Sequence, residues 1–256
     1  MLSASTLLVI PHFNDAERLT PYLTELQSSL SRSFAILVSD DGSDRGEVQQ
    51  LSQLVASLRD RAPEEGPQLL PPLLHPVNTG KGGAVLRGLM QGGNHSLLGF
   101  VDADGAVGAR EIVRAESYFR QNTDRLDALF GSRVKMLGRR IERSLLRHLS
   151  GRIFATLVAV STGLDAYDTQ CGLKLLRQDA FQAIKDRWSV HGFAFDVELC
   201  LLLHNSGKVV EEFPIDWSDQ PGSKVHMLRD SIRMAWMVRQ ISKRSHLQSA
   251  AARKLV

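Results

Sequence analysis

The sequence has few cysteines and no long hydrophobic run. Cys171 and Cys200 are the two cysteines among 256 residues, with no CxxC pair and no ligand spacing typical of zinc. This argues against a disulfide framework and a structural zinc site, and it fits a reducing compartment. The longest apolar stretch, at 153–164, is shorter than the roughly 18 residues that a membrane-spanning helix needs. Since the N-terminal segment also lacks the basic flank of a signal peptide, we expect a cytoplasmic protein without a transmembrane span.

Aromatic residues are scarce and the basic residues are unevenly spread. Aromatics make up 6% of the chain, and no platform for stacking bases is visible, so we expect no nucleic-acid partner. The net charge is only +3, yet residues 133–152 hold seven Arg or Lys and one Glu, and residues 224–256 hold eight and one Asp. Two basic segments on an otherwise acidic body indicate a phosphate-bearing partner or an anionic surface, unless both are simply solvated helices.

Strand-like and helix-like segments alternate along the first half of the chain. Apolar segments at 6–11, 34–44 and 97–106 have the length of strands, and 16–30 and 47–62 have leucines at helical spacing. Pro21 suits the first turn of a helix better than its interior, so we expect the first helix to begin near it. The alternation predicts an α/β fold with a mostly parallel sheet flanked by helices. Ligands bind such sheets at the carboxyl ends of the strands.

Three polar clusters fall at those strand ends, at residues 14–15, 40–44 and 102–104, and a glycine-rich turn at 78–83 opens a helix. Asp102 and Asp104 are two positions apart, so both carboxylates can face one ligand, and hard oxygens suit Mg²⁺ or Mn²⁺ when phosphates complete the shell. The stretch SDDGSD (39–44) could grip a ribose or base edge, or simply form a turn and cap a helix. In NTGKGG (78–83) the glycines let the backbone approach a ligand and Lys81 could neutralise a phosphate, although the P-loop spacing is absent.

These blocks together resemble a known family. IPHFNDAERL, LVSDDGSD, NTGKGGA and VDADGA stand in the order and spacing of the family 2 glycosyltransferases, which have the GT-A fold (Rossmann-like). GSRV, DTQCGLKLLR, HGFAFDVELCLL and IDWSDQPGSKV resemble the polyprenyl-phosphate glycosyltransferases, including the dolichyl-phosphate β-glucosyltransferases. The resemblance implies a single GT-A domain at 1–240, with a nucleotide-sugar half at 1–130 and an acceptor half at 131–240. Residues 241–256 would form a basic C-terminal tail.

The resemblance also implies a donor site and a catalytic set. Asp102 and Asp104 would bind the Mg²⁺ or Mn²⁺ that bridges the diphosphate, and Lys224 would add a second positive charge unless GSK is a surface turn. Asp168 is a candidate general base, or it positions the acceptor or the sugar hydroxyls, or it caps a helix; with Asp104 and Lys224 it forms the catalytic set. The implied nucleotide-side residues are Pro11, Asp15, Asp40, Asp41, Lys81, Gly82, Asp102, Ala103, Asp104 and Lys224.

The acceptor side falls in the basic middle segment. The positions that match those holding the acceptor phosphate in relatives are Arg133, Arg143, Arg147 and Ser150. An arginine fork suits phosphate geometry. The apolar positions Ile141, Leu145, Leu149, Ile153 and Leu157 recur every four residues. This spacing predicts an amphipathic helix, which would lie in a membrane interface as a peripheral contact or pack on the core with a solvated basic face.

The implied reaction is the inverting, metal-dependent transfer of a hexose from a nucleotide sugar to polyprenyl or dolichyl phosphate. UDP-glucose is the first candidate donor and GDP-mannose the second. Two alternatives stay open: a glycosyltransferase with a soluble or protein acceptor, and a catalytically silent nucleotide-binding protein. Near the second-half blocks, Asp196 or Glu198 would hold the sugar or a basic residue, or both would simply bond to backbone.

Overall fold

The computed structural model describes residues 3–142, 155–219 and 237–241. Its centre is a sheet with the strand order β3-β2-β1-β5-β8-β6-β9, in which β4 also pairs with β2. The strands of this sheet are β1 (Ser3–His12), β2 (Phe34–Asp40), β3 (Gln68–Leu69), β4 (Leu73–Leu74), β5 (His95–Val101), β6 (Ala128–Ser132), β8 (Leu173–Arg177) and β9 (Val210–Pro214). Within it, β8 runs antiparallel to β5 and β6, and the other pairings are parallel. The prediction of a mostly parallel sheet is therefore confirmed.

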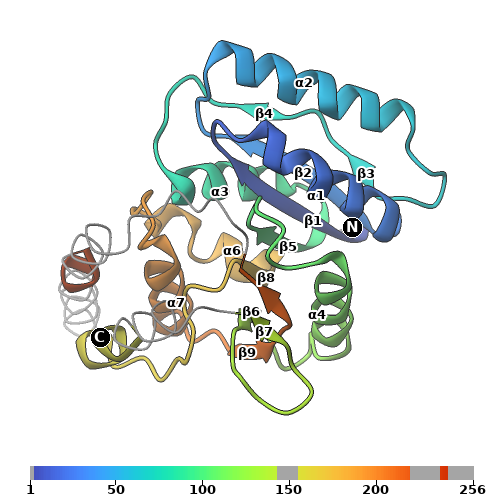
Figure 1. Ribbon diagram of the computed structural model, residues 1–256. Coiled ribbons are helices and arrows are strands. Elements are labelled where there is room, and N and C mark those ends of the chain that lie inside the picture. Colours follow the sequence, from blue (N-terminus) through green and yellow to red (C-terminus); the bar gives the residue numbers. More distant parts are fainter. Residues whose placement is uncertain (1–2, 143–154, 220–236, 242–256) are drawn as a thin grey trace.

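Helices cover both faces of the sheet (Figure 1). One face packs against α1 (Ala16–Ser29), α2 (Arg45–Asp60) and α4 (Ala109–Gln121), and the other against α3 (Lys81–Leu89), α6 (Gln178–Gln182) and α7 (Phe195–Asn205). Short 3₁₀ turns span Met90–Gly92 and Lys185–Arg187, and residues 155–162 and 237–241 are helical. This is the predicted GT-A architecture, with helices on both sides of a single sheet.

The sequence pattern explains both layers. All seven residues of β2 are buried, as expected for a strand that is covered on both faces. In α1, Leu19, Leu23 and Leu26 form the buried stripe. The prediction that this helix begins near Pro21 is wrong, because α1 begins at Ala16 and contains Pro21. Pro21 lies on the exposed side of the helix, where water can satisfy the carbonyl that loses its partner.

The middle segment differs from the predicted amphipathic helix. Ile141 is in the short strand β7 (Ile141–Glu142), which pairs with β10 (Trp217–Ser218), and Leu157 is in the helical segment 155–162. A helix therefore does not begin at Ile141: Gly138 has φ 81°, and the Arg140 amide donates to the Asp216 carboxylate instead of to a helical carbonyl. The other predicted positions of this segment and of the GSK block lie outside the described residues: Arg143, Leu145, Arg147, Leu149, Ser150, Ile153 and Lys224.

None of the helices in the described ranges is both long enough and apolar enough to cross a bilayer.

Candidate functional site

The predicted polar clusters meet at one edge of the sheet. This is the edge where the parallel strands β1, β2, β5 and β6 end and the antiparallel strand β8 begins. Because β8 is reversed, the segment that precedes it, 168–172, reaches the same edge as the loops that follow β1, β2 and β5. The fold thus brings the predicted donor residues of the described ranges, which exclude Lys224, to the same side of the molecule as Asp168.

Asp40 at the end of β2 faces inward. Its carboxylate is fully buried and lies 2.8 Å from His12 Nδ1, and the Ser43 amide donates to it at 3.0 Å. The Asp15 amide donates to His12 Nε2 at 3.3 Å, so Nδ1 carries the proton that His12 donates to Asp40. Burial alone would raise the pKa of Asp40, but the hydrogen bonds from His12 and Ser43 lower it. Asp40 therefore fixes the loops after β1 and β2, and its predicted contact with the nucleotide stays a prediction.

Asp41 connects the end of β2 to the glycine-rich loop. Its carboxylate accepts hydrogen bonds from the amides of Thr79 at 2.9 Å and Gly80 at 2.7 Å. Gly80 has φ 101°, and a methyl group there would lie 2.6 Å from a backbone oxygen of the 190–195 segment. At Gly82 a methyl group would lie 2.5 Å from the side chain of Phe195. The glycines thus allow the loop to pack closely against residues 190–195, and the predicted approach of this loop to a ligand stays a prediction.

Asp102 and Asp104 follow β5, as predicted. Asp102 Oδ1 lies 2.6 Å from the Nζ of Lys81, the first residue of α3. The Asp102 amide donates to the Gly172 carbonyl at 3.0 Å, and a methyl group at position 172 would lie 2.5 Å from the Asp102 carboxyl carbon. Asp104 accepts a hydrogen bond from the Ala106 amide at 3.0 Å, and Arg18 of α1 lies 3.9 Å away. The carboxylate of Asp102 is therefore held between Lys81 and Gly172.

This pair of carboxylates suits a divalent cation. Burial and then the negative charge of Asp102 raise the pKa of Asp104, which indicates two like charges in close proximity. Asp102 Oδ1 is buried, and its partner there is the Lys81 ammonium. No group of three His, Cys, Asp or Glu side chains there could hold a metal, so a cation would need further oxygen ligands from substrate or water. Mg²⁺ and Mn²⁺ accept such a shell, and the residues fit them.

Asp168 is bound to Arg133 at the end of β6. The guanidinium donates two hydrogen bonds to the carboxylate, at 2.7 and 2.8 Å, and the Arg133 amide donates a third at 3.0 Å. Burial would raise the pKa of Asp168, but the charge and hydrogen bonds of Arg133 lower it to about 2. Glu212 of β9 accepts a hydrogen bond from the Asp168 amide at 2.7 Å and so fixes the segment that precedes β8. An aspartate with so low a pKa is a weak base, and this geometry favours the positioning alternative over the general base.

Asp196 and Glu198 take different partners in the first turn of α7. Glu198 accepts hydrogen bonds from the amides of Ser189 at 2.9 Å and Val190 at 2.6 Å, which is the backbone alternative. Asp196 Oδ1 instead lies 2.7 Å from Nζ of Lys174, which is fully buried in β8. No role was predicted for Lys174, Arg18 or His12 from the sequence. Lys174 stands in the apolar run LKLL, and no local pattern reveals that a carboxylate 22 positions later neutralises it.

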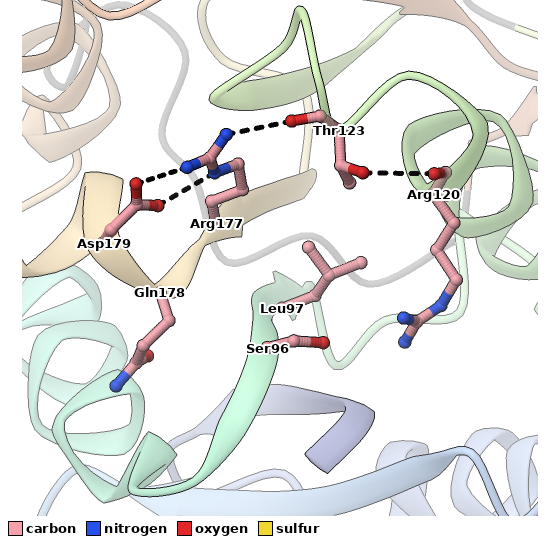
Figure 2. A pocket seen from close by; sticks show the side chains of 7 residues that line it. All are labelled: Ser96, Leu97, Arg120, Thr123, Arg177, Gln178 and Asp179. Carbon is pink, nitrogen blue, oxygen red and sulfur yellow. Dashed lines mark hydrogen bonds and ion pairs between the residues drawn. The ribbon is translucent and has the colours of Figure 1, made fainter. Parts of the chain in front are cut away.

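The hollows of the surface also fall at different ends of the sheet. One of about 390 Å³ borders the loop after Asp104 and is lined by Trp217. Another, of about 400 Å³, lies beside Asp168. A third, of about 530 Å³, lies at the opposite end, where β5 begins and β8 ends (Figure 2). Its Arg177 is paired with Asp179 and bonds the Thr123 carbonyl, so this hollow offers no free charge from that arginine.

Comparison with known proteins gives the family. The model of Glycosyl transferase family 2 matches residues 7–185. A dolichyl-phosphate β-glucosyltransferase from Saccharomyces cerevisiae is 31% identical over 243 residues, which cover 89% of this chain and 71% of that protein. One from Dictyostelium discoideum is 29% identical over 240 residues, with the same two coverages of 89% and 71%. Glycosyltransferase AglD from Haloferax volcanii is 29% identical, covering 89% of this chain and 35% of its own length.

Solved structures share the fold at low sequence identity. Mannosyl-3-phosphoglycerate synthase from Rubrobacter xylanophilus superposes with a TM-score of 0.65 at 16% identity, covering 97% of this chain and 75% of that one. Glucosyl-3-phosphoglycerate synthase from Mycobacterium tuberculosis, solved with Mn²⁺, UDP and phosphoglyceric acid, gives a TM-score of 0.66 at 11% identity, covering 95% and 78%. The resemblance seen in the sequence is confirmed: this chain belongs to Glycosyl transferase family 2 and is a glycosyltransferase of the GT-A fold.

Proposed function

We propose that the protein transfers a hexose from a nucleotide sugar to a polyprenyl or dolichyl phosphate, with inversion at the anomeric carbon and with Mg²⁺ or Mn²⁺ as cofactor. UDP-glucose is the first candidate donor. The observation that carries the proposal is the pair Asp102 and Asp104 at the end of β5, at the same sheet edge as Arg133 at the end of β6. One site could thus bind a diphosphate through a cation and an acceptor phosphate through a guanidinium.

The relatives support the lipid acceptor and the glucosyl group. Two of them, from yeast and Dictyostelium, are named dolichyl-phosphate β-glucosyltransferases and align with 89% of this chain. Their names concern those proteins, and the same substrates for this chain are our inference. The structural neighbour solved with Mn²⁺ and UDP supports the fold, and through it the choice of cation and nucleotide to test first.

The donor half would stabilise the leaving group. An oxygen of the acceptor phosphate attacks the anomeric carbon while the bond from that carbon to the nucleoside diphosphate breaks, and the diphosphate departs with the electron pair. A divalent cation held by Asp102 and Asp104 would offset the growing negative charge as a Lewis acid. Lys81, 2.6 Å from Asp102, can place its ammonium against the same diphosphate. No covalent nucleophile is required from the protein, which agrees with inversion.

The acceptor half would hold the attacking phosphate. Arg133 is oriented by two hydrogen bonds to Asp168, and its guanidinium carbon lies 5.5 Å from the ring centroid of Trp217. A phosphate monoester has its second pKa near about 6, so the attacking oxygen is already largely ionised near neutrality and needs no base. We therefore assign Asp168 the task of orienting Arg133. Arg143, Arg147, Ser150 and Lys224 remain predicted ligands outside the described residues.

A radiolabel transfer assay tests the proposal. The protein is incubated with Mn²⁺ or Mg²⁺, polyprenyl phosphate and labelled UDP-glucose or GDP-mannose, and the label is partitioned into organic solvent. We expect organic-extractable label from UDP-glucose, and we expect both EDTA and the substitution Asp104→Ala to abolish it. Vesicles that carry the acceptor, sedimented with the protein, test the peripheral membrane contact in parallel.

Other outcomes point to the alternatives. Label from GDP-mannose alone would keep the reaction class and change the sugar. Label that stays in the aqueous phase on an added soluble phosphorylated acceptor would contradict the lipid acceptor. Metal-dependent binding of UDP without turnover on any acceptor would favour the catalytically silent nucleotide-binding protein.

A further inference from the structure

Lys81 occupies the place at Asp102 where a cation is needed. Its Nζ lies 2.6 Å from Asp102 Oδ1, an oxygen that is buried in the free protein. The side chains are 20% and 30% exposed, so solvent screens this pair less than a surface pair. Without a bound metal, the ammonium is the countercharge of the oxygen that the proposed metal would use.

The surroundings keep Lys81 charged. The ordinary pKa of a lysine, about 10.4, leaves it protonated near neutrality, and the Asp102 carboxylate 2.6 Å away stabilises the ammonium. The ring of Phe195 adds a favourable contact, with its centroid 5.7 Å from Nζ. Lys81 therefore competes with a divalent cation as a full positive charge.

Asp196 is a second carboxylate that acts on Lys81. It contributes to the electrostatic field at Lys81, but its Oδ1 is already paired with the Lys174 ammonium, 2.7 Å away on the buried side. Lys81, at the start of α3, therefore has the Asp102 carboxylate, in the loop after β5, as its ion-pair partner.

We propose that Lys81 exchanges partners when the donor binds: it pairs with Asp102 in the free enzyme, moves to the diphosphate of the donor, and so releases Asp102 to the divalent cation. This inference rests on the proposed metal-dependent function and deepens it. Cation and nucleotide then bind with positive coupling, because the diphosphate removes the ammonium that competes with the cation. By linkage, each ligand tightens the binding of the other by the same factor.

The proposal predicts opposite effects of one substitution on two ligands. Mn²⁺ binding is followed by the EPR signal of the free ion, with wild type and Lys81→Met, each without nucleotide and with saturating UDP or, if UDP does not bind, GDP. A titration without protein gives the Mn²⁺ that the nucleotide itself binds, and this amount is subtracted. Without nucleotide, Lys81→Met should bind Mn²⁺ about tenfold more tightly than wild type, since the competing charge is gone. Nucleotide should tighten Mn²⁺ binding in both proteins, because the diphosphate supplies ligands to the cation, and about tenfold more in wild type than in the variant, which has no ammonium to displace.

Lys208 offers a matched control. Its side chain is 22% exposed and its Nζ lies 3.3 Å from Asp127 Oδ1, so it too is a half-buried lysine in an ion pair, at the opposite edge of the sheet. Lys208→Met should leave the Mn²⁺ affinity and the coupling unchanged. Lys81→Arg keeps the charge and should retain most of the coupling. Lys81→Gln serves as the second charge-removing variant if Lys81→Met does not fold.

The outcomes separate this inference from the proposed function. Unchanged or weaker Mn²⁺ binding in Lys81→Met and Lys81→Gln without nucleotide, or a coupling equal to that of wild type, would overturn the exchange and leave the transfer reaction standing. A wild type that binds no Mn²⁺ would overturn both the metal dependence and the exchange. A wild type that shows the predicted coupling but forms no lipid product would support the exchange and contradict only the acceptor.

Discussion

The substitution Asp168→Asn tests whether this residue orients Arg133 or acts as a base. The change leaves a buried guanidinium facing a neutral amide, and the two side chains are only 16% and 10% exposed. The pKa of Asp168 is about 2, against 3.8 for the unperturbed group, so the ionised carboxylate contributes about 2 kcal/mol to the stability of the fold. Removing one partner of a buried pair costs more, roughly 3–5 kcal/mol, because the other charge stays behind.

The pH dependence has a definite sign. Because the pKa in the fold is lowered, this contribution is present above a pH of about 3.8 and is lost as the pH falls through about 2. Between pH 5 and 8 the deficit of Asp168→Asn should therefore be constant. One kcal/mol of stability corresponds to roughly 2–4 °C, so at every pH in this range the melting temperature of Asp168→Asn should lie about 10 °C below that of wild type.

Urea unfolding and initial rates at several pH values supply the measurement. We expect Asp168→Asn to raise KM for the acceptor and lower kcat, with a pH–rate profile of unchanged shape. The variant Asp168→Asn with Arg133→Met, which removes both charges, should recover much of the stability and none of the acceptor affinity. Our reasoning would be refuted if Asp168→Asn alone were as stable as wild type and its pH–rate profile lacked an ionisation near neutrality that wild type shows. Asp168 would then be the general base.

Three further predictions follow from buried contacts. Gly172→Ala places a methyl group 2.5 Å from the Asp102 carboxyl carbon, so Mn²⁺ affinity in the EPR assay should fall at least about tenfold, whereas the control Gly46→Ala, with no heavy atom near its new methyl group, should retain it. Lys174→Met leaves Asp196 without its nearest countercharge and should cost roughly 3–5 kcal/mol in urea unfolding; adding Asp196→Asn should restore most of that, and a single variant as stable as wild type would contradict the pairing. Burial raises the pKa of the Cys171 thiol to about 12 and that of the Cys200 thiol to about 11. Iodoacetamide at pH 8 should therefore react slowly with the native protein, and in urea it should label both cysteines quickly.

The sequence was sufficient for the parts of the fold that follow from local patterns. The alternation of apolar segments and leucine stripes predicted β1, β2, β5 and the helices between them, because each depends on residues that are close in the chain. The direction of β8 was not predictable, since LKLLR has the same pattern whichever way the strand runs. The start of α1 was misplaced because a proline is tolerated inside a helix where the carbonyl that loses its partner faces water. Whether Pro21 faces water depends on how the helix packs on the sheet, and the local sequence does not show this.

The site was predicted in position but less well in detail. Asp102 and Asp104 follow β5, where the motif placed them, but the ion pair of Asp168 with Arg133 was not predicted. The burial of Asp40 by His12 was missed, because their contact joins two neighbouring strands 28 positions apart. In general, the motifs identified which residues gather at the edge of the sheet, while the partners that set their charge came from elements distant in the sequence.

The reversed strand β8 has a mechanical consequence for the whole enzyme. It is hydrogen-bonded to β5 on one side and to β6 on the other, so the strand that ends before Asp102 and the strand that ends before Arg133 belong to one continuous sheet. A hinge between these two strands would have to break a central ladder. In the proposed reaction, the entry of substrates and the release of product would therefore depend on loops at the rim, and the spacing of the strands would set the distance between the two phosphates.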